Sequence, residues 1–126
     1  MKLPFKVDLS DKVAVVTGGG GVLMSAFGEA LVKSGAKVAF LDINEEAVKK
    51  VVEGLGDNAM AVKCNCLDKA DIARAKAEVN ARFGKVNFLI NGAGGNNPKA
   101  TCDNETMTPD LTGVKDFFAL DESGLK

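Results

Sequence analysis

The chain has 126 residues, of which 46% are hydrophobic, and this length suits one domain with one hydrophobic core. Its formal net charge of −1 excludes a strongly basic surface for nucleic acid or for an anionic membrane. No segment reaches the roughly 20 apolar residues that span a bilayer, and residues 1–10 lack the apolar run of a signal peptide. We therefore expect a cytoplasmic protein that holds any anionic ligand through local geometry.

The chain has no histidine and no tyrosine, so two side chains that commonly transfer protons in enzymes are missing. Its cysteines are Cys64, Cys66 and Cys102, an odd number that argues against a disulfide framework. A zinc site would need Cys102 and a carboxylate from a distant loop beside the other two thiols. We expect no metal site, and we interpret Cys64 and Cys66 as small buried residues on a strand.

Short apolar segments with the composition of buried parallel strands alternate with amphipathic segments. Strands are predicted at Lys12–Thr17, Lys37–Asp42, Ala59–Leu67 and Val86–Ile90. This order predicts an α/β fold of the Rossmann type, a doubly wound parallel sheet represented by its first four strands (β-α-β-α-β-α-β) and incomplete. The fourth strand would be an unpaired edge, so we expect a fragment of a longer protein.

Each predicted helix has a recognisable start, apolar stripe or end. The first follows the glycines and ends at Gly35, the second is capped by Asn44, and the third runs from a cap at Asp68 to Gly84. The expected buried stripes are Leu23, Ala26, Phe27, Ala30 and Leu31, then Val48, Val51, Val52 and Leu55, then Ile72, Ala75, Val79 and Phe83. Beyond them lie a polar loop at about 94–113, an apolar segment at Val114–Leu120, and Asp121 as the cap of a further helix.

A glycine-rich loop, Thr17-Gly18-Gly19-Gly20-Gly21, directly follows the first predicted strand and opens the first helix. The strict G-x-G-x-x-G spacing fails, because Leu23 and Met24 stand where a third glycine would be. The context still favours a pyrophosphate held by backbone N–H groups and the helix dipole. A merely flexible turn is the alternative, but it would not need four glycines.

Asp42 ends the second predicted strand, at close to the spacing of about 20 residues expected for the acid that binds the adenosine ribose. Its charge would repel the 2′-phosphate of NADP, and no Lys or Arg follows before Lys49, so the sequence favours NAD. A simple helix-capping role for Asp42 is the alternative, although Asn44 can serve as that cap.

The segment Asn91-Gly92-Ala93-Gly94 follows the fourth predicted strand, which would lie beside the first. Ligands of such sheets bind outside the carboxyl ends of the strands near this switch in strand order. Small residues there would let a cofactor approach closely, although the segment alone could equally be a turn.

Taken together, these residues resemble the short-chain dehydrogenase/reductase family. That family usually has T-G-x-x-x-G-x-G after strand one, an acid after strand two in NAD users, Asp-Val after strand three and N-N-A-G after strand four. Here Val22 and Met24 replace the later glycines, Asn65-Cys66 replaces Asp-Val, and Gly92 replaces an asparagine. The cofactor-binding residues expected from the spacing and the resemblance are Thr17, Gly18, Gly20, Gly21, Val22, Leu23, Asp42, Ile43, Asn65, Cys66, Asn91, Gly92, Ala93 and Gly94.

The Thr-Gly-Gly-Gly-Gly-Val-Leu segment and the segment Asn91–Thr101 are similar to a subgroup described as D-mannonate oxidoreductases, or fructuronate reductases. This resemblance implies NAD(H)-dependent interconversion of D-fructuronate and D-mannonate. The family's catalytic serine and Tyr-x-x-x-Lys would lie on a later strand and helix, so no catalytic residue is expected in this chain. The tyrosine count of zero agrees with that expectation.

We expect residues 1–126 to be the N-terminal NAD-binding part of a single Rossmann domain. The expected partners are a small sugar-acid substrate and, in the intact protein, further copies of the chain, with no nucleic acid and no membrane. Two other functions stay open: a non-catalytic dinucleotide-binding module, and a domain that binds S-adenosylmethionine.

Overall fold

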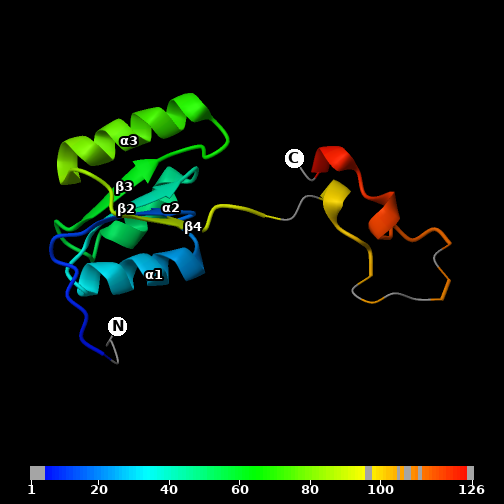
Figure 1. Ribbon diagram of the computed structural model, residues 1–126, viewed down its shortest axis with the longest axis horizontal. Coiled ribbons are helices and arrows are strands. Elements are labelled where there is room, and N and C mark those ends of the chain that lie inside the picture. Colours follow the sequence, from blue (N-terminus) through cyan, green and yellow to red (C-terminus); the bar gives the residue numbers. More distant parts are fainter. Residues whose placement is uncertain (1–4, 96–97, 105, 107–108, 111, 125–126) are drawn as a thin grey trace. The chain divides into compact units, whose positions relative to one another are not determined.

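The structure is a computed structural model that describes residues 5–95, 98–104, 106, 109–110 and 112–124 (Figure 1). The chain divides into two compact units, Met1–Ala93 and Gly94–Lys126, and each is described by itself. The sheet and the α-helices lie in the first unit, whereas the described part of the second has three short 3₁₀ helices, Pro98–Ala100, Phe117–Ala119 and Glu122–Gly124. That both units belong to one Rossmann domain of a longer protein stays a prediction.

The sheet consists of four parallel strands in the order β3-β2-β1-β4. The strands are β1 (Val13–Thr17), β2 (Lys37–Asp42), β3 (Ala59–Lys63) and β4 (Phe88–Asn91). Because β4 lies next to β1 and not next to β3, the chain crosses from one edge of the sheet to the other after β3, as a doubly wound sheet requires. The predicted Rossmann-type α/β fold is confirmed.

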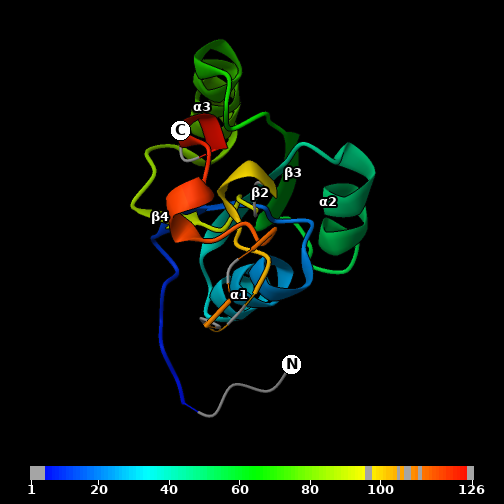
Figure 2. The same cartoon turned by 90° about the vertical axis from the view of Figure 1, so that its right-hand side faces the viewer.

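Helices cover both faces of this sheet. α1 (Val22–Lys33) and α2 (Glu45–Val52) pack against one face, and α3 (Lys69–Phe83) packs against the other (Figure 1; Figure 2). All five side chains of β1 are buried, because alternate residues point into two different cores. Ala14 and Val16 join the core under α1 and α2, whereas Val13 and Val15 join the core under α3.

The predicted buried stripe of α1 is wrong at Leu23, Ala26 and Phe27 and right at Leu31, which packs against the core. Leu23 and Phe27 are 65% and 48% exposed, and the buried position of the helix is Gly28. A Cβ atom on Gly28 would lie 2.0 Å from Cε1 of the buried Phe40 ring, so the missing side chain is what lets α1 approach β2. The residues that face the sheet are therefore Met24, Gly28, Leu31 and Val32.

The ends of the two edge strands also differ from the prediction. β3 ends at Lys63 instead of Leu67, and β4 runs from Phe88 to Asn91 instead of from Val86 to Ile90. Cys64 is buried but lies just past β3, and Cys66 is half-buried in the turn that follows. The interpretation of these cysteines as buried strand residues is therefore right only for the burial of Cys64.

The helix caps follow the sequence prediction closely. The side chains of Asn44 and Asp68 accept hydrogen bonds from the N–H groups of Ala47 and Ala70, at 3.1 and 2.9 Å. Gly35 and Gly84 end α1 and α3 with positive φ angles of 94° and 88°. The expected stripe of α2 is packed in the core, whereas in α3 Ala75 and Val79 are buried and Ile72 is 42% exposed.

The polar loop predicted at about 94–113 falls in the second unit, and its residues 96–97, 105, 107–108 and 111 lie outside the described residues. Asp121 accepts a hydrogen bond from the N–H of Ser123 at 2.8 Å, so it caps a 3₁₀ turn rather than an α-helix. Within the part of the chain that the structure describes, no helix is long and apolar enough to cross a membrane.

Candidate functional site

The predicted site residues gather at the carboxyl ends of the parallel strands. Thr17 ends β1, Asp42 ends β2 and Asn91 ends β4, and the strand register pairs Thr17 with both Leu41 and Asn91. The glycine loop and the turn after β4 therefore lie at the same edge of the sheet. Asn65 and Cys66 follow β3, the neighbour of β2, at this edge.

The backbone N–H groups of the glycine loop mostly bond within the protein. They donate from Gly19 to Leu41 O at 2.9 Å, from Gly20 to Asp42 Oδ2 at 3.1 Å and from Gly21 to Gly18 O at 3.0 Å. The loop is thus a built turn and not a set of free donors for an anion. A phosphate at this place would be bound by the next N–H groups along the chain, those of the first turn of α1.

The start of α1 differs from the starts of α2 and α3. Its N-cap residue is Gly21, and among the described residues no side chain caps it and no acidic residue stands in its first turn. Val22 and Leu23, in that first turn, are 93% and 65% exposed. This end of α1 therefore has backbone N–H groups and a positive dipole end that no side chain of the described residues caps.

The glycines of the loop are required for steric reasons. Gly18 has a φ of +67°, and a Cβ there would lie 2.6 Å from Gly92 O in the turn after β4. A Cβ on Gly20 would lie 2.7 Å from the Cβ of Ala47 in α2. The loop fills a narrow space between two other segments, which side chains would force apart.

The carboxylate of Asp42 links the glycine loop to the start of α2. Its Oδ2 accepts from the N–H of Gly20, and its Oδ1 accepts from the N–H of Asn44 at 2.9 Å. Each carboxylate oxygen can accept a further hydrogen bond, so both remain able to bind hydroxyl groups. Lys49, the first cation after Asp42 in the sequence, is paired with Glu45 at 2.7 Å.

Thr17 joins the glycine loop to the turn after β4. Its hydroxyl accepts hydrogen bonds from the N–H groups of Gly92 and Ala93 at 3.0 and 3.1 Å, and the residue is 8% exposed. Thr17 therefore positions Gly92 and Ala93, two of the predicted cofactor-binding residues, through its side chain.

The turn that carries Asn65 and Cys66 is held by Asp71. The Asp71 carboxylate accepts from the N–H of Asn65 at 2.7 Å and pairs with Arg74 at 2.6 Å. These contacts, first the backbone hydrogen bond from Asn65, hold the pKa of Asp71 below its usual range. The turn is thus fixed from α3, with Leu67 96% exposed at its tip.

The cysteines do not form a metal centre in the described part of the chain, where no group of three or more Cys, Asp or Glu residues could hold an ion. Burial, followed by the nearby Cys66 and Asp71, raises the pKa of Cys64 to about 11. The shift disfavours the thiolate, which is the form of a cysteine that binds a metal.

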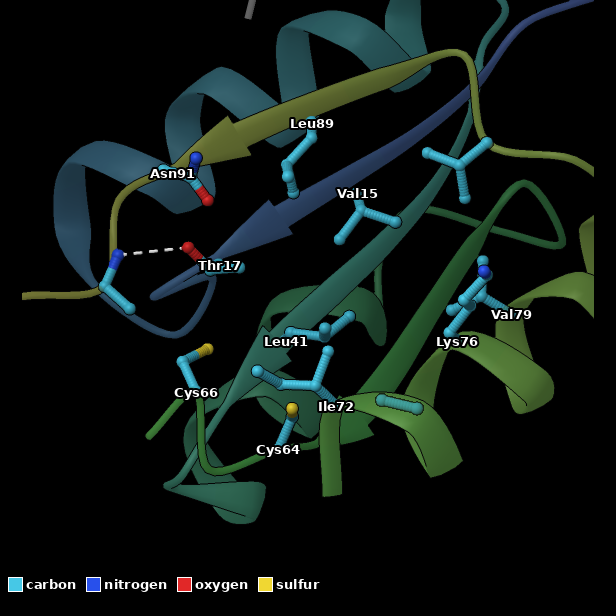
Figure 3. Close-up of a pocket in the computed structure, with 13 residues that line it drawn as sticks. Val15, Thr17, Leu41, Cys64, Cys66, Ile72, Lys76, Val79, Leu89 and Asn91 are labelled. Carbon is cyan, nitrogen blue, oxygen red and sulfur yellow. Dashed lines mark hydrogen bonds between the residues drawn. The ribbon is translucent and has the colours of Figure 1, made fainter. Parts of the chain in front are cut away.

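A cavity of about 430 Å³ lies between the sheet and α3. Val15, Leu41 and Leu89 line it from the sheet, facing Ile72 and Val79 of α3, while Thr17 and Asn91 lie at its carboxyl end (Figure 3). Its walls are mostly apolar, which suits hydrophobic groups better than a pyrophosphate. The polar site described above lies at the carboxyl edge of the sheet.

The chain matches the family model for short chain dehydrogenases over residues 12–114. This chain belongs to the short-chain dehydrogenase family. Among curated relatives, it is 41% identical to an uncharacterized oxidoreductase of Haemophilus influenzae over 100% of this chain and 46% of the relative. It is 43% identical to the uncharacterized oxidoreductase UxuB of Bacillus subtilis over 97% of this chain and 45% of the relative.

Solved structures of this family share the fold. A Haemophilus influenzae protein described as a D-mannonate oxidoreductase, solved with bound NAD, is 41% identical with a TM-score of 0.80, covering 94% of this chain and 44% of that one. A 3-ketoacyl-(acyl-carrier-protein) reductase of Brucella melitensis, solved with NADH, is 33% identical with a TM-score of 0.61, covering 62% of this chain and 32% of that one. The chain thus spans about half the length of the curated relatives it matches.

Sequence reasoning missed two residues at this edge. Met24 was noted only as a replacement for a glycine, but its side chain lies against Gly92. Leu67 was placed on a strand, although it is almost fully exposed on the turn after β3. The available signal for Leu67 was its place in the sequence, directly after Asn65-Cys66 and directly before the helix cap Asp68.

Removing the Thr17 hydroxyl is expected to destabilise the chain. Thr17→Val keeps the shape of the side chain but leaves the N–H groups of Gly92 and Ala93 without their acceptor, at a cost of about 1–3 kcal/mol. Thr17→Ser keeps the hydroxyl and serves as the control. Thermal unfolding followed by circular dichroism measures both variants, and equal stabilities would contradict the positioning role.

Proposed function

We propose that this chain is the NAD(H)-binding half of a short-chain oxidoreductase that acts on a sugar acid, with D-fructuronate and D-mannonate as the substrate pair. The observation that carries the proposal is the arrangement at the carboxyl edge. There the start of α1, which no side chain caps, lies beside Asp42, whose carboxylate accepts a hydrogen bond from the N–H of Gly20 at 3.1 Å.

The residues at this edge fit a dinucleotide. The first turn of α1 would bind the pyrophosphate through its N–H groups, and the glycines give it room to approach. The Asp42 carboxylate would accept hydrogen bonds from the adenosine ribose hydroxyls, and its charge disfavours a 2′-phosphate. Ile43 and Leu67, 65% and 96% exposed on turns after neighbouring strands, would flank the adenine with apolar surface.

The remaining predicted residues would hold the other end of the cofactor. Asn91, Gly92, Ala93 and Gly94 follow β4, beside the central strand β1. When bound, NADH would supply the hydride that a keto-uronate gains, and NAD would accept the hydride that the matching alcohol loses. This chain's residues bind and orient the dinucleotide, and proton transfer would fall to residues outside this chain.

Support for the sugar acid comes from relatives. The chain is 41% identical to the NAD-bound protein described as a D-mannonate oxidoreductase. This likeness covers 94% of the chain.

The proposal predicts cofactor binding without turnover. Calorimetric titration of the 126-residue chain should show tighter binding of NAD than of NADP and no binding of S-adenosylmethionine. The same material mixed with D-fructuronate and NADH should consume no NADH. Tighter binding of S-adenosylmethionine would contradict the proposal, and detectable dehydrogenase activity would overturn the assignment of catalysis to residues outside the chain.

A non-catalytic dinucleotide-binding module is the competing function, and it also predicts that this chain binds NAD. A turnover assay on a longer form of the protein separates the two functions. Consumption of NADH in the presence of D-fructuronate would favour the oxidoreductase, whereas NAD binding without any turnover would favour the module.

A further inference from the structure

Met24 and Gly92 occupy one space between α1 and the turn after β4. A Cβ atom on Gly92 would lie 2.0 Å from Sδ of Met24 and 2.2 Å from its Cγ. Both distances are far below van der Waals contact, so the Met24 side chain fills the volume that any side chain at residue 92 would need. The two residues are distant in sequence, and the contact exists only because β4 pairs with β1.

Met24 and Gly92 are each held in place by further contacts, besides the contact between them. Met24 is half-buried in the first turn of α1 and packs on the core that also includes Ile90 of β4. The N–H of Gly92 donates to the Thr17 hydroxyl, and its carbonyl oxygen would lie 2.6 Å from a Cβ on Gly18. The Gly92 backbone is therefore enclosed by the loop after β1 on one side and by Met24 on the other.

We propose that Met24 and Gly92 form a size-matched pair that sets the position of the Gly92–Ala93 backbone relative to the first turn of α1. Both are positions where this sequence departs from the family pattern, in opposite directions of side-chain size. A large residue on the helix goes with the loss of a side chain on the turn. Met24 is thus a positioning residue, and the effect of the pair on cofactor affinity rests on the proposed function.

The choice of methionine fits this role. Its unbranched, flexible side chain can fill an irregular gap between two backbone segments without forcing them apart. The thioether lies over a backbone whose N–H is already bonded to Thr17, so no polar group loses a partner there.

A double-mutant cycle tests the pair through stability. Gly92→Ala should lower the midpoint of thermal unfolding by about 4–8 °C, because its Cβ meets the backbone oxygen of Thr17 and displaces the Met24 side chain from its place. In the Met24→Ala background the same change should cost clearly less. Part of the cost should remain, since Thr17 O would still lie 2.8 Å from the new Cβ. Gly54→Ala is the matched control, because its Cβ would meet no atom within 4 Å.

The positioning claim needs a measurement on folded protein. At a temperature well below every unfolding midpoint, Gly92→Ala should raise the Kd for NADH about tenfold, and the double variant should recover most of that loss. NADH emission is a clean probe, since the chain has no Trp or Tyr.

The outcomes separate the pair from the proposed function. Additive losses in the cycle, or a Gly92→Ala variant as stable as Gly54→Ala, would overturn the pairing. Coupled stability with an unchanged NADH Kd would overturn the positioning claim alone. If the unaltered chain binds no NADH, the proposed function fails while the stability cycle still decides the pairing.

Discussion

Asp42→Ala is expected to raise the Kd for NAD about 10- to 100-fold, because hydrogen bonds to a charged group contribute about 1.5–3 kcal/mol. The affinity for NADP should fall much less, since the repelling charge is removed as well. The preference for NAD over NADP should therefore largely disappear. Titrations with both cofactors measure it.

Because Asp42 also accepts from Gly20 and Asn44, its loss should loosen the glycine loop. Loosening alone would weaken both cofactors equally, so the ratio of the two Kd values isolates the contact with the ribose. Asp57→Ala is the control, because Asp57 lies just before β3, at the amino ends of the strands and away from the candidate site. An Asp42→Ala variant with an unchanged ratio would refute the proposed role.

Gly18→Ala is expected to destabilise the chain by about 2–4 kcal/mol, which combines a left-handed backbone with overpacking. The residue has a φ of +67°, and its Cβ would lie 2.6 Å from the Gly92 carbonyl oxygen. The new Cβ is bonded directly to the backbone and the Gly92 carbonyl is part of it, so neither group can rotate away. Thermal or urea unfolding followed by circular dichroism measures the loss.

Gly56→Ala is a matched control for this variant. Gly56 has a similar φ of +75°, but a Cβ there would meet no atom within 4 Å. Its substitution should cost only about 1 kcal/mol, from the backbone alone. Equal losses for the two variants would show that the close approach of Gly18 to the turn after β4 contributes nothing.

The two inner strands, β1 and β2, could be predicted because burial requires nearly all of their residues to be apolar. β1 and β2 are buried on both faces, so their apolar runs nearly coincide with the strands. β3 and β4 are edges of the sheet, with partners on one side only, and their ends were misplaced. At Cys64 the apolar composition continues past the end of β3, so composition alone could not locate the turn.

The buried face of α1 could not be predicted, because hydrophobic periodicity depends on apolar side chains and glycine has none. The buried position is Gly28, where the absence of a side chain makes room for Phe40. Leu23 and Phe27 completed a helical stripe in the sequence but lie largely exposed.

The place of the candidate site followed from topology, whereas its internal contacts did not. Asp42 and Asn91 had to lie at the carboxyl ends of the strands, on either side of β1, once a doubly wound parallel sheet was expected. Sequence reasoning assigned the loop glycines to anion binding, but their N–H groups bond mainly to Leu41, Asp42 and Gly18. Such contacts, like the contact between Met24 and Gly92, depend on distances that spacing along the chain does not contain.

The most direct test of NAD binding at this edge is an amide chemical-shift map of the ¹⁵N-labelled chain during titration with NAD. We expect the largest changes in the first turn of α1, in residues 42–43, 65–66 and 92–94, and none at Gly54 or Gly56 on the opposite edge. An absence of shifts, or shifts confined to α3 residues of the apolar cavity such as Ala75 and Val79, would contradict the account.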